Sequence, residues 1–206
     1  GHSAAILEKI GETGKLFAFD QDATALEDSK KHLFRFSNVT YIHDNFSNMP
    51  AHLAPRSVDG ILLDLGVSSP QLDDASRGFS WTKDGPLDMR MDKRHDLTAE
   101  EIVNTYPAEK LFDIFTNFGE ERFSRKIVAA IIYDRKGMRF TSSKQFADFI
   151  FRVASGGRDQ RKATVMRIFQ ALRIEVNQEL HALNLGIEKA VPLLKPNGRL
   201  VVISFH

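Results

Sequence analysis

The chain of 206 residues has no cysteine. This excludes a disulfide framework, thiolate catalysis and zinc sites built on cysteine. No apolar run approaches the roughly 18 residues that a membrane span needs, and the first thirty positions contain nothing like a signal peptide. We therefore expect a cytoplasmic protein without a membrane partner, although Gly1 has the character of an interior position that a targeting segment could precede.

Acidic residues are scarce in one long region. Residues 122–173 hold 13 lysines and arginines but only 3 acids, whereas the rest of the chain has 15 basic and 24 acidic residues. Amphipathic helices with basic outer faces would give this pattern, and so would a surface that faces a polyanion. Both interpretations stay open at this stage.

What is present is typical of a globular α/β protein, with 42% hydrophobic and 27% charged residues. Helical and strand patterns alternate through the first third of the chain, which favours a doubly wound parallel sheet. The predicted helices are 3–11 and 22–34, and the predicted strands are 15–20, 39–43, 58–65 and 200–205.

Helical patterns dominate the middle of the chain, and Ser155–Asp159 reads as a flexible break between two of them. We interpret residues 1–94 and 176–206 as a split nucleotide-type domain, with 95–175 as an inserted helical domain. The predicted helices of this part are 98–105, 107–117, 119–135, 142–155 and a long one over 163–194.

The segment from Asp64 to Asp92 follows an apolar strand and is rich in acids, arginines and aromatics. A connection of more than about 25 residues is too long to be a simple turn, and such loops are usually functional or disordered. Interleaved Phe79, Trp81 and Leu87 argue against disorder, so we predict a functional loop.

Several polar or aromatic side chains are expected at the carboxyl edge of the sheet, where α/β folds bind ligands. Gly1 and His2 begin a helix, Asp20 ends the next strand and could hold ribose hydroxyls, and Phe46 could stack a purine. Asp64 could accept a hydrogen bond from an amine. Together these residues describe an adenosyl pocket.

The spacing of residues along the chain gives weaker support for metal binding and for other substrate contacts. The loop acids could gather magnesium, but their spacing matches no metal loop and the interspersed arginines suggest ion pairing, so no metal is predicted. Arg122 and Lys126 are four residues apart and could contact phosphate. Gln170, Arg173 and Asn177 form a polar row that either supports the core or hydrogen-bonds a substrate.

Long motifs then point to a family. Asp64–Asp74, Arg77–Ser80, Asp84–Asp92, Gly119–Phe123, Phe169–Asn177 and Ile203–His206 resemble the MraW family, over essentially the whole chain. Members are S-adenosylmethionine-dependent methyltransferases of a cytidine N4 in small-subunit ribosomal RNA, and mitochondrial relatives exist, so the matrix is an alternative location.

The resemblance implies a Rossmann-like methyltransferase sheet with an inserted, basic, RNA-facing helical domain. It assigns Gly1 and His2 to the cofactor loop, Asp20 to the ribose, and Phe46, Asp64 and Gln71 to the rest of the S-adenosylmethionine site. It also implies an RNA substrate, presented within the assembled small subunit; a homodimer is possible.

For the reaction, we hypothesise that the cytosine is swung out of its RNA context and stacked on Phe79 or Trp81. Either Asp64 or a backbone carbonyl of the 64–70 turn then accepts a hydrogen bond from N4. Asp88 is a second candidate catalytic carboxylate. The remaining candidate RNA contacts are Arg90, Arg122, Lys126, Arg167 and Arg173.

The chain also departs from the family pattern. Members have a strand and a glycine-rich loop before the equivalent of Gly1, and that strand is central in their sheet, so we expect exposed sheet edges here. Within Ala163–Arg167 only Arg167 matches. A non-catalytic RNA-binding or ribosome-assembly module is therefore the main alternative function, and a nicotinamide dehydrogenase is a weaker one.

Overall fold

The structure is a computed structural model that describes residues 1–204. Phe205 and His206, which end the predicted last strand and the last matching motif, lie outside the described residues. The chain divides into two compact units, one of residues 1–66 with 180–206 and one of residues 67–179. Within the described part, no helix is long and apolar enough to cross a membrane.

The first unit contains parallel strands, as predicted. β1 (Leu16–Asp20) pairs with β2 (Val39–His43), and β3 (Val58–Asp64) pairs with β4 (Leu194–Ile203). The expected continuous sheet is not formed by the described residues, because no strand among them bonds to both pairs. Although β3 is an apolar strand, it is only partly covered, and Leu63 is its one buried residue.

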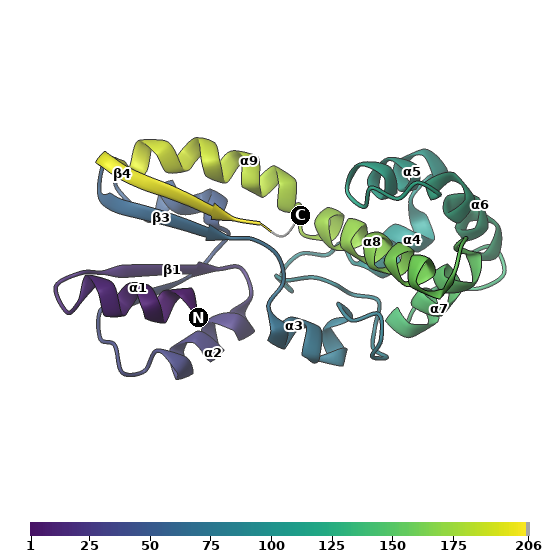
Figure 1. Cartoon of the computed structure of the whole chain (residues 1–206), viewed down its shortest axis with the longest axis horizontal. Helices are drawn as coiled ribbons and strands as arrows, with labels where there is room; N and C mark the ends of the chain where they lie inside the picture. Colours follow the sequence, from purple (N-terminus) through teal and green to yellow (C-terminus); the bar gives the residue numbers. More distant parts are fainter. Residues whose placement is uncertain (205–206) are drawn as a thin grey trace. The chain divides into compact units, whose positions relative to one another are not determined.

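Helices pack around these strands (Figure 1). Leu63, Met49, Ala190 and Leu193 form a small buried cluster to which Phe19 of β1 also contributes. The helices of this unit are α1 (His2–Ile10), α2 (Ala23–His32), η1 (Phe46–Ala51), α9 (Glu179–Ala190) and η3 (Val191–Leu193).

β4 begins earlier than predicted and contains an irregularity. Its register against β3 shifts between Val58, which faces Leu194, and Gly60, which faces Arg199. Asn197 has a positive φ of 67° inside this stretch. A turn around Asn197 therefore interrupts β4, which begins at Leu194 and not at residue 200 as predicted.

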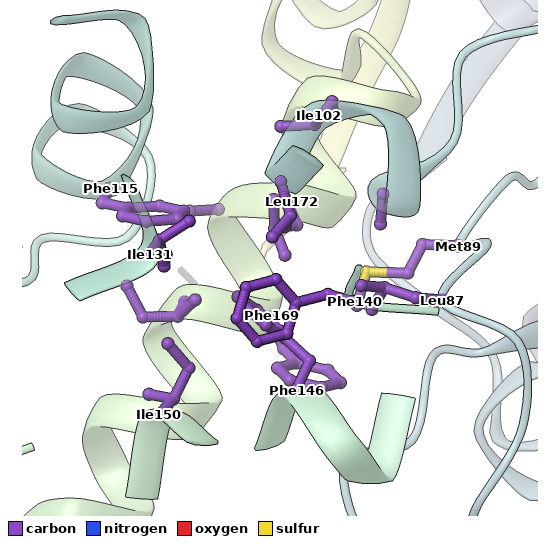
Figure 2. Close-up of a cluster of buried hydrophobic side chains, with 14 of the residues drawn as sticks. Leu87, Met89, Ile102, Phe115, Ile131, Phe140, Phe146, Ile150, Phe169 and Leu172 are labelled. Carbon is purple, nitrogen blue, oxygen red and sulfur yellow. The ribbon is translucent and has the colours of Figure 1, made fainter. Parts of the chain in front are cut away.

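The second unit is built from two short helices within the long acidic loop and from longer helices that follow it. Its buried side chains form one cluster of 24 hydrophobic residues, in which Phe140 lies beside Phe146 (Figure 2), with ring centroids 5.3 Å apart. The Phe140 and Phe149 ring centroids are 4.8 Å apart. The helices are α3 (Ser69–Asp73), η2 (Ala75–Arg77), α4 (Ala99–Thr105), α5 (Ala108–Asn117), α6 (Ser124–Asp134), α7 (Ser143–Val153) and α8 (Arg158–Val176).

Two predicted helices have different limits. α6 starts at Ser124 rather than near residue 119, because Glu120 adopts a positive φ of 51° that an α-helix does not accept. The long helix expected over 163–194 is two helices in the structure. Gln178 has a φ of 53°, which interrupts the helix between α8 and α9.

The boundary between the units also differs from the expected one near residue 94. The acidic loop belongs to the helical unit, which begins at Val67. Leu87 and Met89 of that loop are at most 1% exposed and pack in the helical core, as Figure 2 shows. Burial of these side chains fixes the loop to the helices, which a linear charge pattern did not reveal.

Candidate functional site

Two of the predicted cofactor carboxylates end parallel strands. Asp20 is the last residue of β1 and Asp64 is the last residue of β3. Asp20 Oδ1 accepts a hydrogen bond from the Asp22 backbone N at 2.8 Å, and buried Asp22 in turn caps α2 by accepting from the Thr24 N at 2.9 Å. The carboxylates of Asp20 and Asp22 thus bind backbone N–H groups between the end of β1 and the first turn of α2, and the first of these hydrogen bonds holds the Asp20 side chain at the strand end.

The start of α1 lies beside the end of β3. His2 Nδ1 and Asp64 Oδ2 are 2.9 Å apart, and the two side chains are 58% and 49% exposed. Gly1 is the N-cap residue of α1, and no side chain caps this helix. A Cβ at Gly1 would meet nothing within 4 Å. The helix terminus, its neighbouring imidazole and the Asp64 carboxylate therefore form one polar, solvent-accessible group.

Phe46 begins η1, which follows β2 after Asp44 and Asn45. The predicted adenosyl pocket needs an aromatic ring after this strand. The Phe46 ring lies against α9, since a Cβ built on Gly186 would be 2.4 Å from Phe46 Cε2. The ring is partly buried, and it packs on the small hydrophobic cluster of this unit. Gly186 was not singled out in the sequence, yet it makes the room that Phe46 occupies.

Gln71 belongs to the other unit and has a structural role there. It is 7% exposed, and its Oε1 accepts a hydrogen bond from the Ser68 N at 3.0 Å in a capping box at the start of α3. The pattern Ser-x-x-Gln is a recognisable capping signal. The assignment of Gln71 to the cofactor stays a prediction.

The two aromatic candidates for base stacking have different surroundings. Phe79 is 5% exposed and packs in the helical core, so the structure presents no open face of this ring, contrary to the expectation. Trp81 is partly exposed and lines a hollow of about 190 Å³ together with Phe151 and Val165. Phe151 was not predicted as a site residue.

Asp88 and Arg90 form an ion pair with each other inside the acidic loop. Arg90 donates from Nε and Nη2 to the two Asp88 oxygens at 2.8 and 2.9 Å, and Arg90 Nη1 donates to the His95 carbonyl. Burial disfavours ionisation of Asp88, but hydrogen bonds from the Arg90 side chain and N–H outweigh it and hold the pKa of this carboxyl below its usual value. A depressed pKa suits an ion pair rather than a proton acceptor.

The other loop acids also have separate partners. Asp73 pairs with Lys83, Asp74 accepts from Ser76, Asp84 accepts from the Ser142 hydroxyl, and Asp92 pairs with Arg94. Among residues 1–204, no three histidine, aspartate or glutamate side chains gather as metal ligands would.

Three of the arginines predicted to contact RNA are engaged in ion pairs, and one of them is Arg90, which pairs with Asp88. Arg167 Nη2 lies 2.6 Å from Glu121 Oε2, and the Glu121 side chain is fully buried. Arg173 Nε donates to Glu179 at 2.7 Å. Arg122 and Lys126, in contrast, are exposed; Lys126 Nζ donates to the Ser155 hydroxyl at 3.0 Å.

Comparison with known proteins covers the whole chain. A model of the MraW methylase family matches residues 1–206. The ribosomal RNA small subunit methyltransferase H of Clostridium botulinum (strain Loch Maree / Type A3) is 47% identical over 210 residues, covering 100% of this chain and 68% of the relative. The protein of the same name from Halothermothrix orenii is 43% identical with the same coverage.

Proposed function

Since the chain belongs to the MraW methylase family, we propose that it transfers the methyl group of S-adenosylmethionine to the N4 amine of a cytidine in small-subunit ribosomal RNA. The name of its relatives, ribosomal RNA small subunit methyltransferase H, supports the RNA substrate. The observation that carries the proposal is the contact between His2 and Asp64, because it gathers a helix start and a carboxylate at the end of a parallel strand.

The chemistry of the residues in this unit suits such a cofactor. The uncapped start of α1 offers backbone N–H groups to a carboxylate. Asp20 can accept hydrogen bonds from ribose hydroxyls, and Phe46 can contact an adenine ring. S-adenosylmethionine, when bound, supplies an electrophilic methyl group.

Asp64 is the residue proposed to act on the substrate amine. The N4 lone pair of cytosine is delocalised into the ring, so the amine must be held with its lone pair directed at the methyl group. A carboxylate oxygen of Asp64 accepts one N4 hydrogen bond, which fixes this orientation and favours loss of that proton after transfer. His2 contacts the same carboxylate through its Nδ1.

For the fold, we propose that the two parallel strand pairs belong to one Rossmann-like methyltransferase sheet, with residues 67–179 as the inserted RNA-facing domain. The alternation of helix and parallel strand through the first unit supports this assignment. Action on the assembled small subunit and a homodimer remain predictions; methylation of free RNA against intact subunits, and sedimentation of the protein, test them.

The test compares two carboxylates on the same strand in the full-length protein. Asp64→Asn keeps the shape and the contact with His2 but removes the charge. Loss of a charge-assisted hydrogen bond worth about 1.5–3 kcal/mol lowers the single-turnover methylation rate by roughly 10- to 100-fold. Asp59→Asn removes an exposed carboxylate on β3 that pairs with Lys195, and leaves the rate unchanged.

Full rate and full cofactor affinity in Asp64→Asn would contradict the assignment. RNA binding without any methyl transfer by the unaltered protein would favour the alternative of a non-catalytic RNA-binding module. Fluorescence titration with a nicotinamide cofactor separates the dehydrogenase alternative.

A further inference from the structure

Seven cations near the start of α6, the end of α7 and the start of α8 have no acidic partner among the described residues, although neighbouring cations do. Arg139 pairs with Glu100, Lys144 with Asp148 and Arg167 with Glu121. Within residues 149–174 the only acid is Asp159. The seven cations, which we call the cationic surface, are Arg122, Arg125, Lys126, Arg152, Arg158, Arg161 and Lys162.

Hydrogen bonds connect the parts of this surface. Lys126, at the start of α6, donates from Nζ to the Ser155 hydroxyl at 3.0 Å, in the loop between α7 and α8. Arg161, in the first turns of α8, donates from Nε to the Gly156 carbonyl at 2.9 Å. The start of α6, the end of α7 and the start of α8 thus present their cations around one short loop.

A hollow lies next to this surface, and one cation of the surface contacts an aromatic ring in the wall of the hollow. Trp81, Phe151, Ala147 and Val165 line it, and its volume of about 190 Å³ is several times the roughly 30 Å³ share of one water molecule, enough to admit a ring. The Arg161 guanidinium carbon lies 5.9 Å from the centroid of the Phe151 ring. Positive charge and an aromatic wall therefore meet at Phe151.

We propose that a single strand of the substrate RNA binds here, with its phosphates on the cationic surface and one unstacked base in the hollow between Trp81 and Phe151. This inference rests on the proposed function and extends it to a site for RNA outside the reacting cytidine. Stacking platforms beside cations are the common means of holding single strands. Lys144 and Asp148, which also line the hollow, offer a donor and an acceptor to the base edge.

An acidic protein segment would satisfy the charges but would not require an aromatic hollow beside them. A duplex would meet the charges too, but its stacked bases cannot enter the hollow. RNA with unpaired nucleotides is the ligand that uses both features.

The chain carries a natural reporter, because Trp81 is its only tryptophan. Titration of the full-length protein with a 12-nucleotide single-stranded RNA, without cofactor, quenches Trp81 fluorescence in parallel with the rise in RNA anisotropy. Inorganic polyphosphate and a duplex of the same sequence bind the cations and leave the fluorescence largely unchanged. RNA binding without quenching would overturn the placement of a base in the hollow.

A charge-matched pair of variants tests the surface. Arg158→Gln with Lys162→Gln weakens RNA binding several-fold and reduces the slope of log affinity against log salt by about 1.4, since each lost contact to a single strand contributes roughly 0.7. Lys15→Gln with Lys136→Gln removes the same charge from two exposed lysines outside the surface and changes neither quantity.

If both double variants weaken RNA binding equally, the proposed surface is wrong. RNA affinity then depends only on the net charge of the protein. Circular dichroism confirms that each variant is folded. Because these measurements need neither cofactor nor methyl transfer, failure of this RNA site and failure of the proposed methyltransferase activity give different results.

Discussion

Asn177 uses both ends of its side-chain amide inside the protein. Its Oδ1 accepts from the Met91 N at 2.7 Å and its Nδ2 donates to the Met89 carbonyl at 2.8 Å. Gln170 donates to the Phe118 carbonyl. The polar row that contains these residues therefore anchors the acidic loop and a helix end, which favours the structural interpretation over substrate binding.

Asp92 illustrates how single ion pairs of the loop depend on pH. Arg94 donates to its carboxylate and, against the opposing effect of burial, holds the pKa of Asp92 below its usual value of 3.8. A group with a depressed folded-state pKa stabilises the protein above its unfolded pKa, and this stabilisation is lost as the pH falls through the folded pKa.

We therefore predict that Asp92→Asn costs about 1 kcal/mol of unfolding free energy at pH 7 and progressively less below about pH 4. Asparagine still accepts the Arg94 backbone N–H that Asp92 now binds at 2.9 Å, so only the charge changes. Urea denaturation at several pH values measures the difference. Asp113→Asn, at an exposed site on α5, is the control, and a pH-independent cost in Asp92→Asn would contradict the argument.

At the scale of elements, the turn between α5 and α6 packs closely on α8. A Cβ on Gly119 would lie 2.7 Å from the Arg167 carbonyl, so a larger residue does not fit there. Beside it, the buried Glu121 carboxylate is bound by Arg167 and accepts the Phe123 N–H at 2.9 Å. Arg167 thus braces α8 against this turn, which gives the residue a structural role, while its contact with RNA stays a prediction.

Removal of this brace has a predictable cost. Arg167→Ala leaves the Glu121 charge buried and unpaired, which costs about 2 kcal/mol, less than for a fully buried pair because Arg167 is 37% exposed. The double variant with Glu121→Gln recovers part of the loss. Chemical denaturation measures both, and Met166→Ala, at an exposed neighbouring position, is the control.

If Arg167→Ala instead leaves stability unchanged and weakens RNA binding, the RNA contact predicted from the sequence is correct and the bracing role is wrong.

At the scale of the whole molecule, the hydrophobic core is unequally divided. The helical unit holds a cluster of 24 buried hydrophobic residues, whereas the cluster in the strand-containing unit has 4. Because burial of apolar surface is the main source of folding stability, we expect the helical unit to be the more stable of the two.

We predict that a fragment of residues 67–179 folds alone, with cooperative thermal unfolding and helical circular dichroism. A fragment of residues 95–175, cut at the boundaries predicted from the helical pattern of the sequence, lacks Leu87, Met89 and Met91 and unfolds without cooperativity. Equal behaviour of the two fragments would show that the acidic loop does not belong to the helical core.

The sequence by itself determined the parts of this protein that depend on neighbours in the chain. Alternating apolar patterns located β1, β2 and β3, helical periodicity located α4, α5 and α7, and long motifs identified the family. Strand ends also located Asp20 and Asp64, because a residue at the carboxyl end of a strand needs no distant contact to be placed there.

The tertiary structure alone decided which charges are satisfied and where the units divide. The sequence does not distinguish Arg122 from Arg90, Arg167 and Arg173. In the structure, the last three form ion pairs with acids that are two to 46 positions away in the chain. Leu87 and Met89 are part of an acidic loop in the sequence and part of the helical core in space. Composition measures how many charges and apolar side chains are present, whereas only packing brings partners that are distant in the chain within bonding distance.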